Sequence, residues 1–155
     1  MERLNLTQEW DKVFPRSDKV EHGKVTFHNR YGITLAADVY VPKNAEGKLP
    51  AIAVSGPFGA VKEQPSGLYA QKMAEMGFFT IVFDPSYTGE IRSAVLLVHG
   101  EKAHSRYFSE TAYSKLSGDN KELLIIPGAS HTDLYDQMDV IPFEKLKAFF
   151  EEHLK

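Results

Sequence analysis

The sequence contains no cysteine, which excludes disulfide bonds, cysteine-ligated zinc sites and thiol nucleophiles. No apolar run approaches the roughly 18–20 residues that a membrane span requires, and the charged first residues lack the apolar core of a secretory signal. Neither sign of charge dominates, because 18 Lys and Arg residues are matched by 21 Asp and Glu residues. We therefore expect no nucleic-acid partner, no membrane partner and a cytoplasmic location.

The composition is typical of one globular domain with a hydrophobic core. The 155 residues are 43% hydrophobic and 25% charged, and no internal repeat or low-complexity tract divides them. We expect a single domain over residues 1–155. Its first 21 residues form a polar lead-in that could contain one short helix before Pro15.

Short strand-like and helix-like segments alternate along the rest of the chain. Residues 24–29 and 33–41 are β-rich, and Gly32 allows the tight turn of a hairpin between them. Short apolar runs typical of strands buried on both faces follow at 50–56, 78–84, 93–100 and 121–128. Helical spacing and stop signals predict helices over 65–76, 106–116 and 142–154.

This order of elements predicts an α/β fold. Each strand–helix–strand passage is typical of a right-handed βαβ unit, which builds a parallel sheet. We expect an open, mostly parallel sheet of about six strands with the antiparallel hairpin of residues 24–41 at its N-terminal edge. In the helix of 106–116, Phe108, Ala112 and Leu116 form one apolar stripe.

His131 follows the last predicted strand, in the segment LIIPGASHTDLYD. Reactive groups in open α/β sheets gather at the carboxyl ends of strands. A histidine there can act as a general base, because its unperturbed pKa lies near neutrality. The alternative is a surface histidine bonded to a neighbouring carboxylate, for which Asp133 and Asp136 are available.

Two further loops follow predicted strands. The glycines of SGPFGAVKEQPSG, residues 55–67, could let backbone amides bind an oxyanion, or could only serve a tight strand-to-helix turn. In HGEKAHS, residues 99–105, Glu101 could orient an imidazole and His104 could be a second base, although charged loop residues commonly just face solvent. No carboxylate cluster completes a metal shell around His99 and His104, so we expect neither a metal nor another cofactor.

Together these segments resemble the α/β-hydrolase superfamily, in its bacterial branch of dienelactone-hydrolase-like and acyl-peptidase-like proteins. Residues 24–42 resemble the opening hairpin, and residues 50–90 resemble the oxyanion strand, first helix and next strand. Residues 94–113 and 122–136 are similar to the segments that carry the acid and the histidine. The resemblance implies a serine-type hydrolase that acts on a small-molecule ester or acyl substrate.

The resemblance also implies roles for individual residues. His131 matches the catalytic histidine, and the amide of Phe58, with Gly59 beside it, matches the first oxyanion donor. The family commonly has an aspartate three residues after the strand-ending glycine, where this chain has Ala103. Glu101 is therefore the candidate acid. His104 and Ser105 remain open as alternatives.

The serine nucleophile of the family is missing. The family carries G-x-S-x-G on a strained strand-to-helix turn, and no two glycines of this chain lie four positions apart. Ser55 would lie on the wrong side of the substrate carbonyl, and Ser86 and Ser105 have no such turn. Glu90 continues directly into Ile91 where the family has a helix, the nucleophile strand and further elements, so we predict an internal deletion at 90/91.

The predicted deletion has consequences for fold and function. The shortened sheet is expected in the order hairpin, 78–83, 50–55, 94–99, 122–127, with one face partly bare, which favours a homodimer or a domain-swapped oligomer. We interpret the chain as an inactive or impaired member of a hydrolase family. A non-catalytic binding module that uses the same loops is the alternative, and a metal- or water-dependent hydrolase built on His131 and His104 ranks last.

Overall fold

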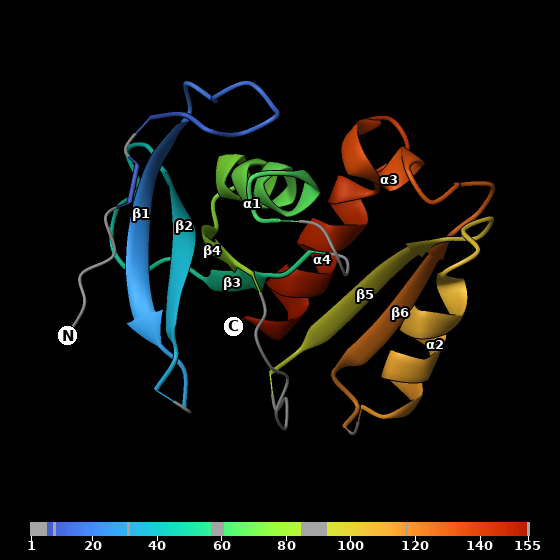
Figure 1. The fold of residues 1–155 in the computed structure, drawn as a ribbon. Coiled ribbons are helices and arrows are strands. Elements are labelled where there is room, and N and C mark those ends of the chain that lie inside the picture. The colour runs from blue at the N-terminus through green and yellow to red at the C-terminus, as the bar shows by residue number, and fades with distance from the viewer. Residues whose placement is uncertain are drawn as a thin grey trace. The chain divides into compact units, whose positions relative to one another are not determined.

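The computed structural model describes residues 6–7, 9–30, 32–56, 61–84, 93–116 and 118–154. The chain divides into two units, residues 1–86 and 87–155, whose elements are labelled in Figure 1. The expected single domain stays a prediction. None of the helices within the described ranges is long and apolar enough to cross a membrane.

The first unit contains a four-stranded sheet in the order β1-β2-β4-β3 (Figure 1). Its elements are β1 (Val20–His28), β2 (Thr34–Pro42), β3 (Ala51–Val54), α1 (Pro65–Glu75) and β4 (Phe79–Phe83). The hairpin runs in register from Val20 opposite Pro42 to His28 opposite Thr34. Gly32 in its turn has φ +77°, a conformation that glycine adopts without steric cost. The predicted hairpin is present.

Strands β3 and β4 are parallel and are connected by helix α1, as the βαβ pattern predicts. Proline at the first helical position suits α1, because that position has no intrahelical partner for an N–H. The hydroxyl of Thr80 in β4 donates to the carbonyl of Ala70 in α1 at 2.9 Å, so this buried polar group is satisfied. The β1-β2-β4-β3 order agrees with the order predicted for the first four strands.

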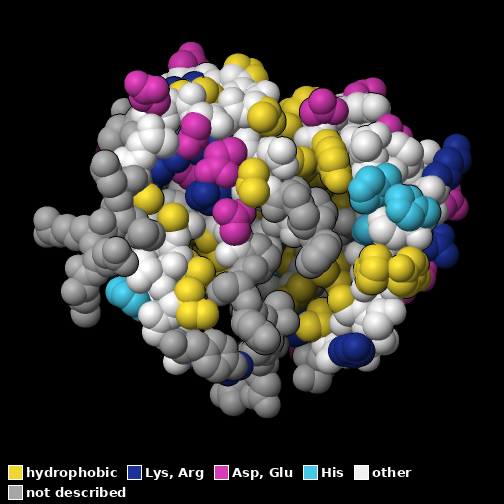
Figure 2. Space-filling view, in the orientation of Figure 1, with side chains coloured by type: hydrophobic (Ala, Val, Ile, Leu, Met, Phe, Trp, Pro, Cys, Tyr) yellow, Lys and Arg dark blue, Asp and Glu magenta, His cyan; other side chains and the backbone are white. Residues whose placement is uncertain are grey.

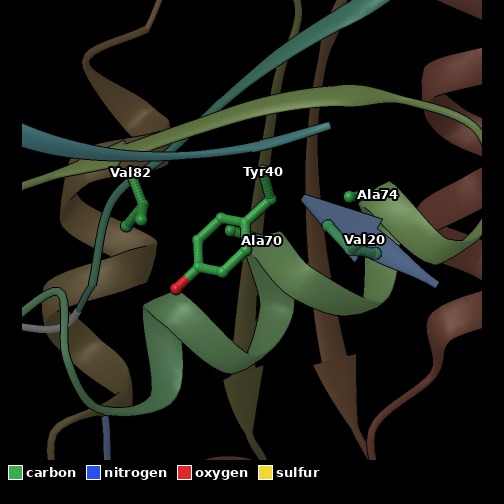
Figure 3. Packing of buried hydrophobic residues seen from close by; sticks show 5 residues of the cluster. All are labelled: Val20, Tyr40, Ala70, Ala74 and Val82. Carbon is green, nitrogen blue, oxygen red and sulfur yellow. The ribbon is translucent and has the colours of Figure 1, made fainter. Parts of the chain in front are cut away.

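The core of the first unit lies between α1 and the sheet. Figure 3 shows Val20, Tyr40 and Val82 from the strands beside Ala70 and Ala74 from α1. The two alanines lie four positions apart on one face of the helix, and their small side chains allow the helix to approach the strands closely. All five residues are at most 2% exposed.

The lead-in differs from the expected polar segment. No helix precedes β1 among residues 6–7 and 9–19, so the expectation of a short helix before Pro15 is wrong for the described part. Instead Phe14 is buried, and the side chain of Gln71 in α1 accepts from the Ser17 amide and donates to the Pro15 carbonyl, both at 3.0 Å. These hydrogen bonds satisfy backbone groups that a helix would have paired internally.

The second unit contains a pair of parallel strands, β5 (Val95–Gly100) and β6 (Lys121–Ile126), connected by α2 (Arg106–Ser114). A short helix, α3 (Asp133–Asp136), and a longer one, α4 (Phe143–His153), follow. Phe143, Leu146 and Phe149 of α4 are buried at the helical spacing that the sequence predicts, whereas Phe150 is only partly buried. The apolar periodicity therefore placed this helix correctly.

The prediction of one sheet of about six strands is wrong, because the described strands form a four-stranded sheet and a two-stranded sheet. The coarser prediction of a mixed α/β fold is confirmed. Each parallel ladder joins two strands connected by their own helix. Between β4 and β5 only residues 84–94 are available, fewer than the dozen or so that a parallel crossover needs.

Candidate functional site

The loops after β5 and β6 lie side by side. The two strands are parallel and end opposite each other, with Gly100 paired to Ile126. A Cβ on Gly100 would lie 2.5 Å from the carbonyl oxygen of Ser130 and 2.6 Å from that of Ala129, so only glycine fits there. The Lys102 amide donates to the Ala129 carbonyl at 2.8 Å, which fixes one loop against the other. This contact brings His131 near the loop that follows β5.

His131 makes hydrogen bonds to hydroxyl groups with both ring nitrogens. Its Nδ1 lies 3.0 Å from the Ser105 hydroxyl, and its Nε2 lies 3.2 Å from the hydroxyl of Tyr135. The side chain is exposed, and Tyr135 comes from the short helix α3. Of the two alternatives to Glu101 left open by the sequence, Ser105 hydrogen-bonds this imidazole, whereas His104 makes a ring contact with it.

The neighbouring carboxylate of Asp133 has other partners. It accepts from the Ser130 amide at 2.8 Å and from the Gln137 side chain at 3.0 Å. The hydrogen bonds from Ser130 are the main cause that lowers the pKa of Asp133. Asp133 therefore shapes the loop that carries His131 and does not pair with the imidazole.

Ser105 lies between two imidazoles. Its Oγ is 3.0 Å from Nδ1 of His131 and 3.2 Å from Nε2 of His99, the histidine of β5. The other ring nitrogen of His99, Nδ1, lies 2.8 Å from the Ser109 hydroxyl. The result is a continuous series of hydrogen bonds, Ser109–His99–Ser105–His131–Tyr135, which we term the hydroxyl–imidazole chain.

The two histidines of this chain have different surroundings. His99 is partly buried in its strand, whereas His131 is exposed. Burial, followed by the positive charges of His131 and Arg106, lowers the pKa of His99, and the carboxylate of Glu110 opposes this shift. A proton therefore resides on His99 less readily than on an unperturbed histidine.

His104 is exposed beside the hydroxyl–imidazole chain, with its ring centroid 5.4 Å from that of His131. Within the described ranges no group of three or more His, Asp or Glu residues is arranged to hold a metal ion. His104 is thus a polar neighbour of the site.

Glu101, the candidate acid, lies in the same loop but makes a different contact. Its carboxylate accepts from the Gly128 amide at 2.8 Å, in the turn where Gly128 has φ +73°. Its role in a triad stays a prediction. The candidate oxyanion donors Phe58 and Gly59 lie outside the described residues, as do Ser86 and the 90/91 junction.

An exposed aromatic pair lies in the first turn of helix α2. Tyr107 and Phe108 are 56% and 62% exposed, and their ring centroids are 4.2 Å apart. The apolar stripe predicted for this helix, which includes Phe108, does not make it a buried helix, because α2 contains no buried residue. Figure 2 shows histidine side chains gathered on this part of the surface, with hydrophobic side chains beside them.

A second polar cluster, in the first unit, was missed by the sequence analysis. Asp38 in β2 is fully buried, with Lys12 Nζ 3.1 Å from one carboxylate oxygen and His22 Nε2 2.9 Å from the other. Asp11 bonds both Lys12 and Lys24. We term these five residues the Asp38 cluster. Its only signal in the sequence is an aspartate inside the apolar strand TLAADVYVP.

In the Asp38 cluster, burial alone would raise the pKa of the two carboxyl groups, but hydrogen bonds and nearby positive charges outweigh this effect and lower it. Burial alone would raise the pKa of Asp38, but hydrogen bonds from His22 and Lys12 lower it. Burial would likewise raise the pKa of Asp11, but hydrogen bonds from Lys12 and Lys24 lower it to about 2. This cluster holds the lead-in against the hairpin, and the side chains of Asp38 and Lys12 at its centre are fully buried, so we interpret it as structural.

Comparisons with known proteins place the chain among others of its fold. No protein-family model matches it. The chain is 33% identical over 320 aligned positions to the uncharacterized protein PA2218 of Pseudomonas aeruginosa, covering 98% of this chain and 86% of that protein. The crystal structure of PA2218 matches with a TM-score of 0.83 over 99% of this chain and 100% of that one.

Two further similarities are more limited. The uncharacterized protein YcjY of Escherichia coli is 45% identical over 73 residues, which cover 44% of this chain and 24% of that protein. The structure of a dienelactone-hydrolase-like protein of Klebsiella pneumoniae matches with a TM-score of 0.60 and 13% identity, over 86% of this chain and 99% of that one. At that identity the similarity shows the fold, which is that of α/β hydrolases.

Proposed function

This chain belongs to the family of the uncharacterized Pseudomonas aeruginosa protein PA2218, and from that premise we propose that it is a hydrolase-family protein of the serine-ester type that has lost its nucleophile elbow. The α/β-hydrolase fold supports the proposal, although fold by itself does not establish function. The chain would keep the histidine end of an ester- or acyl-hydrolysing site and would hydrolyse its substrate slowly or not at all.

The position of His131 is the observation that carries this proposal. The imidazole follows β6, and its Nδ1 is bonded to a side chain from the loop after β5, the neighbouring parallel strand. This is how a catalytic histidine is oriented by a residue of the adjacent loop. A histidine placed there can take a proton from a hydroxyl or from water.

The length of the alignment supports the loss of an internal segment. The similarity to PA2218 spans 320 positions, whereas this chain has 155 residues. At least 165 positions, 320 less 155, therefore lie opposite gaps. The absence of any G-x-S-x-G sequence is consistent with a missing segment that contained the elbow.

The partner of His131 also predicts a weak catalyst. The side chain bonded to Nδ1 is the neutral hydroxyl of Ser105, at the position where a triad has a carboxylate. A hydroxyl cannot stabilise the imidazolium as a carboxylate does, and replacing the triad carboxylate of a serine protease by a neutral group costs about four orders of magnitude in rate. Both the missing nucleophile elbow and the neutral partner of His131 therefore predict slow hydrolysis.

Hydrolysis of p-nitrophenyl acetate at pH 7.5 tests the proposal. We expect slow release of p-nitrophenol, far below the 1–1,000 per second that is typical of enzymes, and about a tenfold loss in His131→Gln, because general-base catalysis contributes about 10²–10⁴-fold in competent sites. His28→Gln is the matched control, since His28 is also exposed and bonded to a hydroxyl, that of Thr34. Turnover at ordinary enzyme rates would refute the loss of the nucleophile.

A non-catalytic binding module is the second candidate, and the exposed pair Tyr107 and Phe108 favours it. An aromatic surface of this kind can stack against a flat ligand without any chemistry. Binding of p-nitrophenol with hydrolysis unaffected by His131→Gln would support the binding module. Loss of hydrolysis in that variant would favour the remnant hydrolase.

A further inference from the structure

We propose that Ser105 is a site of covalent acyl transfer, whose hydroxyl accepts an acyl group from an aryl ester while His131 accepts the proton. The inference goes beyond the proposed function, which assigns no nucleophile to this chain, and it rests on that function only for the class of acyl donor. It is carried by the geometry of the hydroxyl–imidazole chain.

Ser105 occupies the N-cap position before helix α2, but its side chain does not cap the helix. Serine at this position normally accepts a hydrogen bond from a backbone amide of the first turn. Here the side chain makes no capping hydrogen bond, and its Oγ is instead within 3.2 Å of His99 and 3.0 Å of His131. The hydroxyl is thus held by two groups that can exchange protons with it.

One arrangement of protons satisfies every hydrogen bond of the chain and leaves His131 ready to act as a base. Ser109 donates to Nδ1 of His99, whose Nε2–H donates to the oxygen of Ser105. Ser105 then donates to Nδ1 of His131, whose Nε2–H donates to Tyr135. In this arrangement one imidazole accepts the serine proton, while the other donates a hydrogen bond that holds the serine oxygen in place.

The opposite arrangement, in which His99 accepts the proton, is disfavoured by its surroundings. His99 is partly buried, and burial together with the charges of His131 and Arg106 lowers its pKa. His131 is exposed, so water can solvate the imidazolium that forms there. His131 is accordingly the base, and His99 is a positioning residue.

The surroundings of Ser105 indicate an aryl donor. The hydroxyl is partly exposed, so an ester can reach it. Tyr107 and Phe108 follow within one turn of helix and present exposed rings against which an aromatic leaving group can stack.

The step balances without any added reagent. The Ser105 oxygen bonds to the ester carbonyl carbon, and its proton moves to Nδ1 of His131. The bond from that carbon to the phenolic oxygen then breaks, and the phenol leaves with the proton that the imidazolium returns. The products are an acylated Ser105 and a free phenol, and water later hydrolyses the acyl group to a carboxylic acid.

Covalent labelling tests the proposal. The 155-residue chain is incubated with p-nitrophenyl acetate, or separately with an aryl fluorophosphonate that releases fluoride, and the adduct is located by peptide mass spectrometry. We expect one adduct per chain on Ser105, none in Ser105→Ala, and at least tenfold slower labelling in His131→Gln. Ser114→Ala is the control, because Ser114 lies on the same helix and bonds only a backbone carbonyl in the structure as described.

The outcomes separate this inference from the proposed function. Labelling that persists unchanged in Ser105→Ala, or the absence of any adduct, overturns the role of Ser105. If slow hydrolysis still depends on His131 in that case, the remnant hydrolase survives. Rapid turnover through an adduct on another serine overturns both. The urea unfolding midpoint of each variant, expected to be unchanged, excludes loss of fold as the cause.

Discussion

The two units each contain histidines bonded to oxygen atoms, but they use them differently. In the first unit His22 bonds the carboxylate of Asp38, which is fully buried and also paired with Lys12. In the second unit His131 and His99 bond neutral hydroxyls at a surface that ligands can reach. Similar residues therefore form a structural cluster in one unit and a candidate reactive site in the other.

Burial and charge explain the difference. A buried carboxylate must be compensated by opposite charge, and the ammonium of Lys12, 3.1 Å from Asp38, supplies it. The hydroxyl–imidazole chain contains no carboxylate, and among the described residues its histidines bond only hydroxyl groups. Removing a member of the first cluster should mainly change stability, and removing a member of the second should mainly change reactivity.

The largest expected effect follows from Asp38→Asn. This change removes one of the two carboxylates that pair with the buried ammonium of Lys12, the other being Asp11, and breaking a buried ion pair costs about 3 kcal/mol or more. Urea denaturation should show this loss in the free energy of unfolding. Asp18→Asn, at an exposed position, is the control and should stay within about 0.5 kcal/mol. Equal effects of the two changes would contradict the structural role of the cluster.

The next effect concerns the backbone beneath His131. In Gly100→Ala the new Cβ would collide with the carbonyls of Ser130 and Ala129, so the loop must shift. Such overpacking costs about 2 kcal/mol. Gly23→Ala, where the Cβ would meet only a Val39 methyl at 3.6 Å, is the matched control. A Gly100→Ala protein as stable as the control would show that the loops are not in close contact.

Acid should destabilise the first unit through its carboxylates. The pKa of Asp11 is lowered to about 2, and that of Asp38 is also lowered. A lowered folded-state pKa means that the stabilisation is present above about pH 4–5 and is lost as the pH falls toward 2. Allowing for solvent screening, Asp11 contributes about 1 kcal/mol. Asp11→Asn should therefore flatten the fall of unfolding free energy over this range, and an unchanged pH profile would contradict the pairing.

The smallest expected effect on stability is in the second unit. Ser105→Ala removes two hydrogen bonds of a partly exposed side chain. The free energy of unfolding should change by less than about 0.5 kcal/mol, while labelling by the aryl ester is abolished. A loss comparable to that of Asp38→Asn would mean that the hydroxyl–imidazole chain is structural too, and the contrast between the units would fail.

Local patterns in the sequence predicted much of each unit. The alternation of apolar runs with helical spacing placed the hairpin, both βαβ passages and helix α4, because hydrophobic periodicity is set by which side chains must leave water. The order of the first four strands was also predicted, since short connections restrict which strands can be neighbours. The same reasoning placed His131 at the carboxyl end of a strand.

What only the tertiary structure decided involves residues far apart in the chain. The pairing of Lys12 with Asp38 and of Ser105 with His131 joins positions 26 residues apart in each case, and no local pattern encodes either. Two other features also depend on residues far apart in the chain. They are the close approach of Gly100 to the carbonyl of Ser130 and the division of the strands into two sheets. The sequence alone determined which segments form strands and helices, because that depends on neighbouring residues. Which side chains meet depends on the packing of whole elements, and only the folded chain specifies it.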